Sequence, residues 1–587
     1  GPRAGGLIGE QAMRRARQLL ADGGVLAVKG IGGYHLACDA GNEAAVSTLR
    51  KRKDRGDKPF AVMVADLAAA AEIVEFEPVG PAAALLTGAR RPIVLLPRRR
   101  GSPIADAVAP GNPDLGVLLA YTPLHALLLA GRAPLVMTSG NLSGEPIITD
   151  DQQALDRLAG LADGWLMHDR PIHVPCDDSV IRLVDGAELP VRRSRGYAPL
   201  PVALADPVPA TLATGGDLKN TFCIAEGRYA WLSAHVGDMD DLATWQAFEL
   251  AEAHLRALTG VQPAQLATDL HPGYRSARWA IEHAGQRPVR RIQHHHAHIA
   301  SCLADNGIAA DDPAGPVIGF AFDGTGYGPD GASWGGEVLI ADYRGYQRVA
   351  HLRYTALPGG DAGVRNPCRM ALSHLRSAGL DWDARLPAVA ACTEREQLAA
   401  QLERSLNCVP TSSVGRLFDA VSSLVGICHR TSYQAQAAIE LEGQARAFIE
   451  QPAAIDSGYL IDCLPSGELD PSPLLAAIVT DVLAGLQPGL IAARFHHALA
   501  AAVAECAQRL RSERGQNRVA LSGGVFLNGL LLSLCVRRLG ERGFQVLRHR
   551  QVPPSDAGLA LGQLVIAAQQ DFDDQSKPER ATVSVDG

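Results

Sequence analysis

The sequence predicts an α/β protein made of two units, the second of which has two lobes that close on a central cleft. Short apolar runs followed by glycine or small polar residues recur along the chain, which is typical of strands that end in ligand-facing turns. Residues 365–510 read as mostly helical, whereas 210–345 and 517–570 alternate strands, turns and helices. Strands on both sides of an inserted helical block favour a two-lobed second unit.

The division between the units is predicted from chain length and proline content. The chain has 587 residues, too many for a single hydrophobic core. Four prolines fall within residues 199–209, and proline is poorly tolerated in helices and central strands. We therefore expect an extended Pro-rich linker at 201–209, between a unit at 7–200 and a unit at 210–570. The polar residues 571–587 are expected to form a disordered tail.

The first unit is expected to mix helices with short strands. A helix is predicted over 9–22, and apolar strands over 25–28, 60–64 and 92–96. No short-period repeat occurs in the sequence.

Composition excludes several classes of protein. No apolar run is long enough to span a bilayer, and the first residues lack the apolar core of a signal peptide, so we expect a cytoplasmic protein without a membrane partner. The eleven cysteines include no Cys-x-x-Cys pair, which argues against zinc ribbons and a disulfide scaffold. The net charge of −8 counts against nucleic acid as a partner.

A basic turn in the first unit is the first candidate site. Lys53, Arg55 and Lys58 place three cations within six residues, directly before the strand that begins at Phe60. Cations at the mouth of a strand suit an anionic substrate, although a solvated basic turn is the alternative. The run 136–141 ends an apolar strand in hydroxyl and amide groups, and Arg193 belongs to a second cationic turn.

Histidines in the second unit form the other candidate site. His294 and His298 are spaced four apart on a helix expected over 293–303, so both imidazoles lie on one face. Two such imidazoles can share zinc or iron, although histidine clusters are often solvated surface. Glycine-rich turns at 323–328 and 522–525 each follow an apolar strand, and glycine lets the backbone approach phosphate or ribose.

Residues 10–200 resemble the YrdC/Sua5 family, whose members adenylate a carbamoyl-type acid with ATP. The family's Lys-x-Arg…Lys-Pro signature falls on residues 53–59, and its Thr-Ser-x-Asn signature on 138–141. The usual Pro-Thr-x-Thr is replaced by the Lys-Gly-x-Gly-Gly-Tyr-His-Leu version at 29–36. The resemblance implies a site for ATP, Mg²⁺ and carbamoyl-AMP at Lys29, Lys53, Arg55, Lys58, Ser139, Asn141, Ser179 and Arg193.

Residues 210–570 resemble the Kae1/TsaD-like domain of the actin/Hsp70/sugar-kinase (ASKHA) superfamily; no Walker P-loop motif occurs. The family's metal motif falls on His294 and His298, and its third ligand on Asp556 of Pro553-Pro554-Ser555-Asp556. The resemblance implies that His294, His298 and Asp323 are catalytic, while His295 and His296 are bystanders. The implied nucleotide-binding residues are Lys219, Asn220, Asp323, Gly324, Gly326, Asp419, Gly523, Gly524 and Asn528. Asp323 and Asp419 could instead cap turns or helices.

The order of the two units resembles the HypF family of hydrogenase-maturation carbamoyltransferases. The resemblance implies formation of carbamoyl-AMP from ATP and carbamate, the latter supplied from carbamoyl phosphate. It further implies transfer of the carbamoyl group to the C-terminal cysteine of HypE, which later yields a cyanide ligand of the NiFe site. The acylphosphatase and zinc-finger motifs that normally open such proteins are not found in this sequence.

Two alternatives and one departure from the family stay open at this point. Small-molecule O-carbamoyltransferases of antibiotic pathways use the same folds in the opposite order, and an ATP-driven switch of the Hsp70 type would release ADP rather than AMP. The family usually has Tyr-Glu-Gly-Gln-Ala-Ala before a Glu-Leu-Glu helix, whereas this chain has Gln434-Ala435 in place of Glu-Gly. This puts a charged or backbone-close contact there in doubt.

Overall fold

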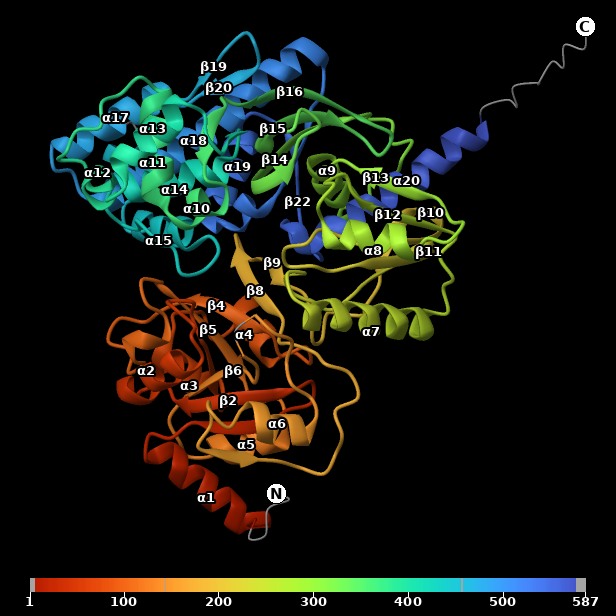
Figure 1. Cartoon of the computed structure of the whole chain (residues 1–587), viewed down its shortest axis with the longest axis vertical. Helices are drawn as coiled ribbons and strands as arrows, with labels where there is room; N and C mark the ends of the chain where they lie inside the picture. The colour runs from red at the N-terminus through yellow and green to blue at the C-terminus, as the bar shows by residue number, and fades with distance from the viewer. Residues whose placement is uncertain (1–5, 143, 456–457, 577–587) are drawn as a thin grey trace, which may run out of the picture.

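The computed structural model describes residues 6–142, 144–455 and 458–576, and its chain forms two halves (Figure 1). The first half, drawn in red to gold, lies on one side of the molecule, and the larger second half, in olive to blue, lies on the other.

The first half is built on a mixed nine-stranded sheet in the order β7-β1-β2-β6-β3-β5-β4-β8-β9. Apolar clusters pack on both faces of this sheet, as the predicted continuous apolar strands require. The strands are β1 Leu26–Lys29, β2 Tyr34–Asp39, β3 Ala61–Val64, β4 Ile93–Pro97, β5 Asp114–Leu119, β6 Leu135–Ser139, β7 Gly164–Leu166, β8 Val180–Val184 and β9 Ala187–Arg192. The helices are α1 Gly9–Ala21, α2 Glu43–Arg52, α3 Leu67–Ile73, α4 Pro81–Thr87, α5 Pro123–Leu129 and α6 Asp151–Arg157, with a 3₁₀ turn at Asp106–Val108.

The β8–β9 hairpin reaches from the first half to the second (Figure 1). Val184 and Leu189 are buried in the same apolar cluster as residues of the second half such as Phe320. Ion pairs also connect the two halves. Arg182 of the first half lies 2.5 Å from Glu442 of the second, and Arg446 of the second half pairs with Asp114 of the first and with Glu442. The two halves therefore share a core as well as a polar interface.

The first lobe of the second half contains a four-stranded sheet in the order β11-β10-β12-β13. Its strands are β10 Val202–Ala213, β11 Cys223–Leu232, β12 Gln265–Asp269 and β13 Val289–Ile292, and its helices are α7 Leu242–Thr259 and α8 Arg275–His283. The expected linker at 201–209 is wrong, because most of it belongs to β10. The strand accommodates Pro207 and Pro209 where its register with β11 shifts, and it pairs with β12 only from Thr211 onward.

The second lobe is built on another nine-stranded sheet, with the path β19-β20-β16-β15-β14-β21-β22 and β17 and β18 beside it. The glycine turn expected at 323–328 is instead the end of β14, with a register shift between Phe322 and Gly326. The strands are β14 Val317–Tyr327, β15 Ser333–Ala341, β16 Tyr346–Leu352, β17 Thr355–Pro358, β18 Cys408–Thr411, β19 Asp462–Cys463, β20 Glu468–Asp470, β21 Arg518–Ser522 and β22 Gln545–Arg548.

The predicted helical block covers this sheet (Figure 1). Its helices are α10 Asp361–Arg365, α11 Pro367–Ser377, α12 Pro387–Ala391, α13 Arg395–Glu403, α14 Val414–Leu424, α15 Gln436–Ala445, α16 Pro452–Ile455, α17 Ser472–Leu483 and α18 Pro488–Arg514, followed after β21 by α19 Gly529–Glu541. Helix α18 is long and apolar enough to cross a membrane, but 78% of its most apolar window is buried inside the protein. That burial is typical of a core helix.

Helices α9, His294–Asp305, and α20, Leu559–Ser576, cross at the centre of the second half. A Cβ atom on Gly562 would lie 1.8 Å from the carbonyl oxygen of Ala297, so this crossing needs glycine. The predicted disordered tail begins too early, because α20 continues to Ser576; the remainder of that tail, 577–587, lies outside the described residues.

The departure at Gln434-Ala435 has a backbone consequence. Ala435 has φ 62° and ψ 14°, the left-handed conformation that glycine adopts without strain. We expect Ala435→Gly to raise the free energy of unfolding by about 0.5–1 kcal/mol, because relief of left-handed strain outweighs the entropy cost of glycine. Denaturant unfolding measures this. Ala438→Gly, inside α15, is the control and should lower the free energy of unfolding by about 1 kcal/mol. If Ala435→Gly is no more stable than the unaltered protein, left-handed strain at this residue is not significant.

Candidate metal centre and anion site

The first turn of α9 carries the histidines of the candidate metal centre. Gln293 caps the helix by accepting a hydrogen bond from the backbone N–H of His296. His294 and His298 lie one turn apart and are almost fully buried. Nδ1 of His294 lies 2.8 Å from Oδ2 of the buried Asp269, at the end of β12, so its Nε2 points the other way.

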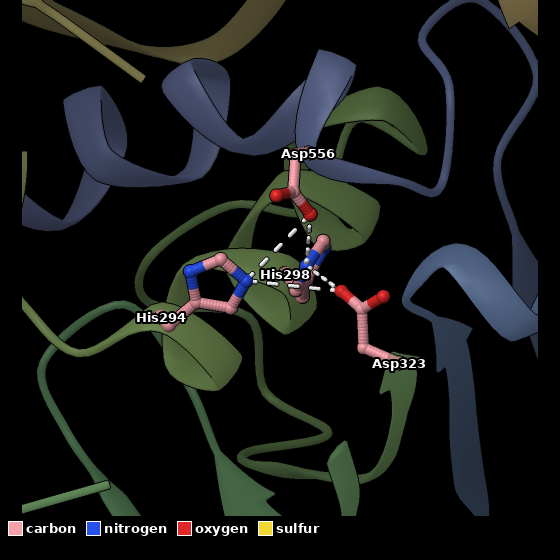
Figure 2. Close-up of side chains that lie close together, drawn as sticks. All are labelled: His294, His298, Asp323 and Asp556. Carbon is pink, nitrogen blue, oxygen red and sulfur yellow. Dashed lines mark ion pairs between the residues drawn. The ribbon is translucent and has the colours of Figure 1, made fainter. Parts of the chain in front are cut away.

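Two carboxylates complete the group (Figure 2). Asp323 comes from β14 and Asp556 from the 3₁₀ turn Asp556–Gly558 that precedes α20. Nε2 of His298 lies 2.9 Å from Oδ2 of Asp323 and 3.6 Å from Oδ1 of Asp556. Nε2 of His294 lies 3.7 Å from the same two oxygens. Residues more than 250 positions apart in the sequence therefore converge on one point.

The donor atoms of this group fit a metal ion. One ligand atom from each of the four residues can be chosen so that all lie within 4.8 Å of one another. Bonds of about 2.1 Å to a tetrahedral ion would place donors about 3.4 Å apart, close to these separations. Nε2 of both histidines and Oδ2 of Asp323 are buried without a hydrogen-bond partner within the described part of the chain. Buried polar atoms that converge without partners are the arrangement expected of ligands to a cation.

Electrostatics at the group also favour positive charge. Burial alone would lower the pKa of His294, but the carboxylates of Asp269, Asp323 and Asp556 outweigh it and raise the pKa well above its usual value. The neighbouring His295 has the opposite behaviour, because burial and then His294 lower its pKa. Nε2 of His296 donates to the carbonyl of Asp342 at 2.6 Å, and this residue does not join the group.

Glycine-rich segments pack directly against this group. A Cβ on Gly326 would lie 2.5–2.6 Å from the rings of His295 and His294, and a Cβ on Gly524 would lie 2.9 Å from Oδ1 of Asp323. Gly523 has φ 98°, and its Cβ would meet the carbonyl of Phe322 at 2.2 Å. Gly324 donates its backbone N–H to Oδ1 of Asp323. The two predicted glycine segments thus meet beside the four ligands.

Other residues predicted to bind nucleotide in this half hold the backbone in place. The side chain of Asn220 donates to the carbonyls of Thr214 and Gly216, which closes the turn between β10 and β11. Asn528 caps α19 through the N–H of Leu531 and contacts His496. These contacts use the NH₂ groups of both side chains, whereas Oδ1 of Asn220 is buried without a hydrogen-bond partner among the described residues.

Asp419 and Lys219 differ in their surroundings. Asp419 lies 2.7 Å from Arg416, and burial raises its pKa to about 6 despite that partner. Lys219 donates its backbone N–H to Asp238, while its ammonium has no hydrogen bond or ion pair within the described residues. Between these two residues, Lys219 is thus the one whose charged group has no partner in the described part of the chain.

In the first half, the two signature segments meet at the anion site. The ammonium of Lys53 donates to the carbonyls of Ser139 and Asn141 and to Oδ1 of Asn141, at 2.5–2.8 Å. All three of its donors are used, so Lys53 fixes the end of β6. Arg55 donates to Thr138 and to the carbonyls of Lys58 and Pro59, which leaves two of its five N–H groups.

Burial and neighbouring cations lower the pKa values of the basic turn, although the carboxylate of Asp177 acts in the opposite direction. Burial and then Arg55 lower the pKa of Lys53 to about 7, and the same two causes lower the pKa of Lys58 to about 8. Burial and then Arg50 lower the pKa of Arg55 to about 9. Cations that depress one another's pKa are stabilised by a bound anion, as expected of a phosphate site.

Three further residues predicted to bind the nucleotide either lie away from the basic turn or already use their polar groups within the fold. Lys29 is buried and paired with Asp151 at 2.7 Å. The fully buried hydroxyl of Ser179 donates to the carbonyl of Arg195 and accepts from the N–H of Ser194. Arg193 lies beside Arg90 and Tyr197 at the junction of the halves.

Sequence reasoning missed two features of these sites. Asp269, which orients His294, ends a strand and carries no motif, and Asp323 was not expected among the metal ligands. The second half also touches the basic turn, because the N–H of Asp57 donates to Ser432 and the carboxylate of Asp57 lies 3.5 Å from the amide of Gln436.

The fold and the sites together define a protein in which an α/β half with a cationic turn is joined to a two-lobed ASKHA-like half with a buried metal-type group. Residues 18–194 match the Sua5/YciO/YrdC family model, described as telomere recombination. Residues 206–305 match the HypF Kae1-like domain, and 319–563 match the second subdomain of the carbamoyltransferase Kae1-like domain. The chain belongs to the HypF carbamoyltransferase family.

Several HypF carbamoyltransferases are similar in sequence to nearly the whole chain. Carbamoyltransferase HypF2 of Cupriavidus necator is 42% identical over 94% of this chain and 72% of its own length. Carbamoyltransferase HypF of Rhodobacter capsulatus is 42% identical over 95% and 73%. A crystal structure of full-length HypF in the phosphate- and nucleotide-bound form superposes with a TM-score of 0.89, at 38% identity over 95% of this chain and 86% of that chain. The T. kodakarensis HypF structure also gives 0.89, at 33% identity, covering 97% and 75%.

Proposed function

We propose that this carbamoyltransferase acts in NiFe-hydrogenase maturation by forming carbamoyl-AMP in its first half and transferring the carbamoyl group in its second. The observation that carries the proposal is that one chain holds two separate sites. One is a cationic turn in which the ammonium of Lys58 makes no hydrogen bond or ion pair with the described residues, and the other is a metal-type group beside glycine segments. An adenylate made at the first site gives the second a good leaving group.

The first step joins carbamate to ATP, with Mg²⁺ as the expected counter-ion of the triphosphate. A carbamate oxygen attacks the α-phosphorus, the bond to the bridging oxygen breaks, and pyrophosphate leaves. The free N–H groups of Arg55 and the ammonium of Lys58 bind phosphate oxygens and offset the charge that develops on the leaving group. Lys53 keeps Ser139 and Asn141 in place through its three hydrogen bonds.

The second step transfers the carbamoyl group to the C-terminal cysteine of HypE. The thiolate sulfur attacks the carbamoyl carbon, and AMP leaves with the bonding electron pair. A zinc or iron ion held by His294, His298, Asp323 and Asp556 would supply Lewis-acid polarisation of the carbamoyl oxygen. The glycine segments at 323–326 and 523–524 let the adenylate approach the group closely.

The same proposal includes the source of carbamate, the protein partner and the cellular location. Carbamate derives from carbamoyl phosphate, HypE is the protein partner, and neither nucleic acid nor a membrane takes part; we place the protein in the cytoplasm. Because carbamoyl-AMP is easily hydrolysed, the contact of Ser432 and Gln436 with the basic turn suits a sheltered route between the halves.

Product analysis tests this function. Incubation with ATP, Mg²⁺ and carbamate should release pyrophosphate, and addition of HypE should release AMP and increase the partner's mass by one carbamoyl group. Release of ADP would overturn the proposal in favour of an ATP-driven switch. AMP release and carbamoylation of a small-molecule hydroxyl, with HypE left unmodified, would favour an O-carbamoyltransferase.

A further inference from the structure

A cavity of about 700 Å³ lies at the junction of the two halves, away from both proposed reaction sites. The first half contributes residues of β9, of the segment that follows it and of the turn before β4, and the second half contributes residues at and after the end of β22. The charged and aromatic side chains in its wall are Arg90, Glu188, Arg193, Tyr197, Arg548 and Arg550.

The wall of this junction cavity is strongly cationic. Among its lining residues, four guanidinium groups face one carboxylate, that of Glu188, which accepts a hydrogen bond from the hydroxyl of Tyr197. Two further carboxylates lie behind the wall: Asp185 beside Arg548, and Asp305, which accepts from the backbone N–H of Arg550. The whole chain carries a net charge of −8, so this concentration of positive charge is local. The arginines come from segments far apart in the sequence, and their positive charges repel one another in the folded protein. A bound anion would reduce that repulsion.

Arg193 has donors without acceptors. Its side chain is 4% exposed, and Nη2 donates to the carbonyl of Leu200 at 2.6 Å. Nε and Nη1 have no hydrogen-bond partner within the described residues. A buried guanidinium with unused N–H groups costs free energy unless an acceptor is supplied. A ligand in the cavity is one source of such an acceptor.

The other three arginines keep donors available at the rim. Arg90 stacks on the ring of Tyr197 at 4.7 Å from its centroid, which fixes the plane of its guanidinium. Arg548 lies 3.6 Å from Asp185 and donates to the carbonyl of Val184 at 3.3 Å. The guanidinium of the exposed Arg550 has no ion pair or hydrogen bond within the described chain.

We propose that the junction cavity binds a small anion that carries two or more phosphate groups and bridges the two halves. Guanidinium groups bind phosphate through paired N–H···O bonds, and several of them converge here around a volume within the usual range for small-molecule sites, about 300–1,000 Å³. The anion contacts Arg90 and Arg193 from the first half and Arg548 and Arg550 from the second. It therefore links the two halves at a place that shares no residue with the basic turn or with the metal-type group.

Calorimetric titration with inorganic pyrophosphate tests the site. Because the basic turn also binds this anion under the proposed function, the titration is done on Arg55→Ala protein as well as on the unaltered chain. One binding event should persist in Arg55→Ala. It should weaken about tenfold or more when Arg550→Gln is added, and further when Arg548→Gln is added. ATP–pyrophosphate exchange should be unchanged in the Arg548→Gln/Arg550→Gln protein that retains Arg55.

Two further measurements keep the test decisive. Arg537→Gln/Arg542→Gln removes the same charge from helix α19 and the residue after it, and should leave pyrophosphate affinity within about twofold, since distant surface charges are screened. Arg550→Gln alone removes no side-chain hydrogen bond or ion pair to the described residues, so it serves as the test if the Arg548 variant unfolds. No pyrophosphate binding in Arg55→Ala, or equal affinity in Arg550→Gln, would overturn the proposal; loss of exchange in the double variant would also do so.

Discussion

His294→Ala is expected to purify without its metal ion and to lose carbamoyl transfer. Removing one of four ligands leaves a buried cavity and two carboxylates with less compensating charge, so metal affinity should fall at least about 100-fold. Transfer to HypE should fall about 1,000-fold or more, because Lewis-acid polarisation contributes several kcal/mol to such a step. Elemental analysis of the purified protein and a carbamoylation assay of HypE measure the two effects.

The matched control is His296→Ala on the same helix turn. His296 contacts the carbonyl of Asp342 and lies outside the ligand group, so metal content and transfer should stay close to those of the unaltered protein. Pyrophosphate exchange in the first half should survive in both variants. Full metal occupancy in a His294→Ala/His298→Ala protein would show that the ion, if any, is bound elsewhere.

Arg55→Ala is expected to abolish adenylation while sparing the second step. Its two free N–H groups would bind phosphate, and charge-assisted hydrogen bonds contribute about 1.5–3 kcal/mol each, so exchange should fall about 100-fold or more. Transfer from supplied carbamoyl-AMP should continue, since the metal-type group is unchanged. Radiolabelled pyrophosphate exchange and HPLC of AMP release distinguish the two steps.

Two further variants distinguish loss of phosphate-binding charge from loss of folding stability in this experiment. Lys58→Ala removes an ammonium that makes no hydrogen bond or ion pair with the described residues, and it should reduce exchange without lowering the unfolding temperature. Arg52→Ala removes a cation one turn away that pairs with Asp163 at the surface, and it should leave exchange within about twofold. If Arg55→Ala and Lys58→Ala both exchange at the normal rate, adenylation does not take place at the basic turn.

Much of the architecture followed from the sequence. The family and fold class are confirmed, and the helix expected at 293–303 lies at His294–Asp305. The spacing of apolar residues and the positions of glycine are local features of the sequence, so helices and strands could be predicted from them. The linker at 201–209 was wrong because proline, which has no backbone N–H, is excluded from a strand only where the neighbouring strand requires an N–H at that position. Pairing partners cannot be read from the local sequence.

The sites were predictable only in part, for a similar reason. Motif spacing indicated which residues gather near a ligand, and the structure does bring His294, His298 and Asp556 together. Spacing could not reveal that the ammonium of Lys53 is fully hydrogen-bonded within the fold, because its partners Ser139 and Asn141 come from a distant segment. Asp269 escaped notice since its role depends on where β12 ends relative to α9.

The shared core at the β8–β9 hairpin has a consequence for how the chain is made. Domains generally fold in order of synthesis, so the first half leaves the ribosome before the helices that cover Val184 and Leu189 exist. During that interval the hairpin presents an apolar edge with nothing to pack on. A chain cut near residue 200 would keep that edge exposed for good, so the halves should be far more soluble when co-expressed than when produced apart.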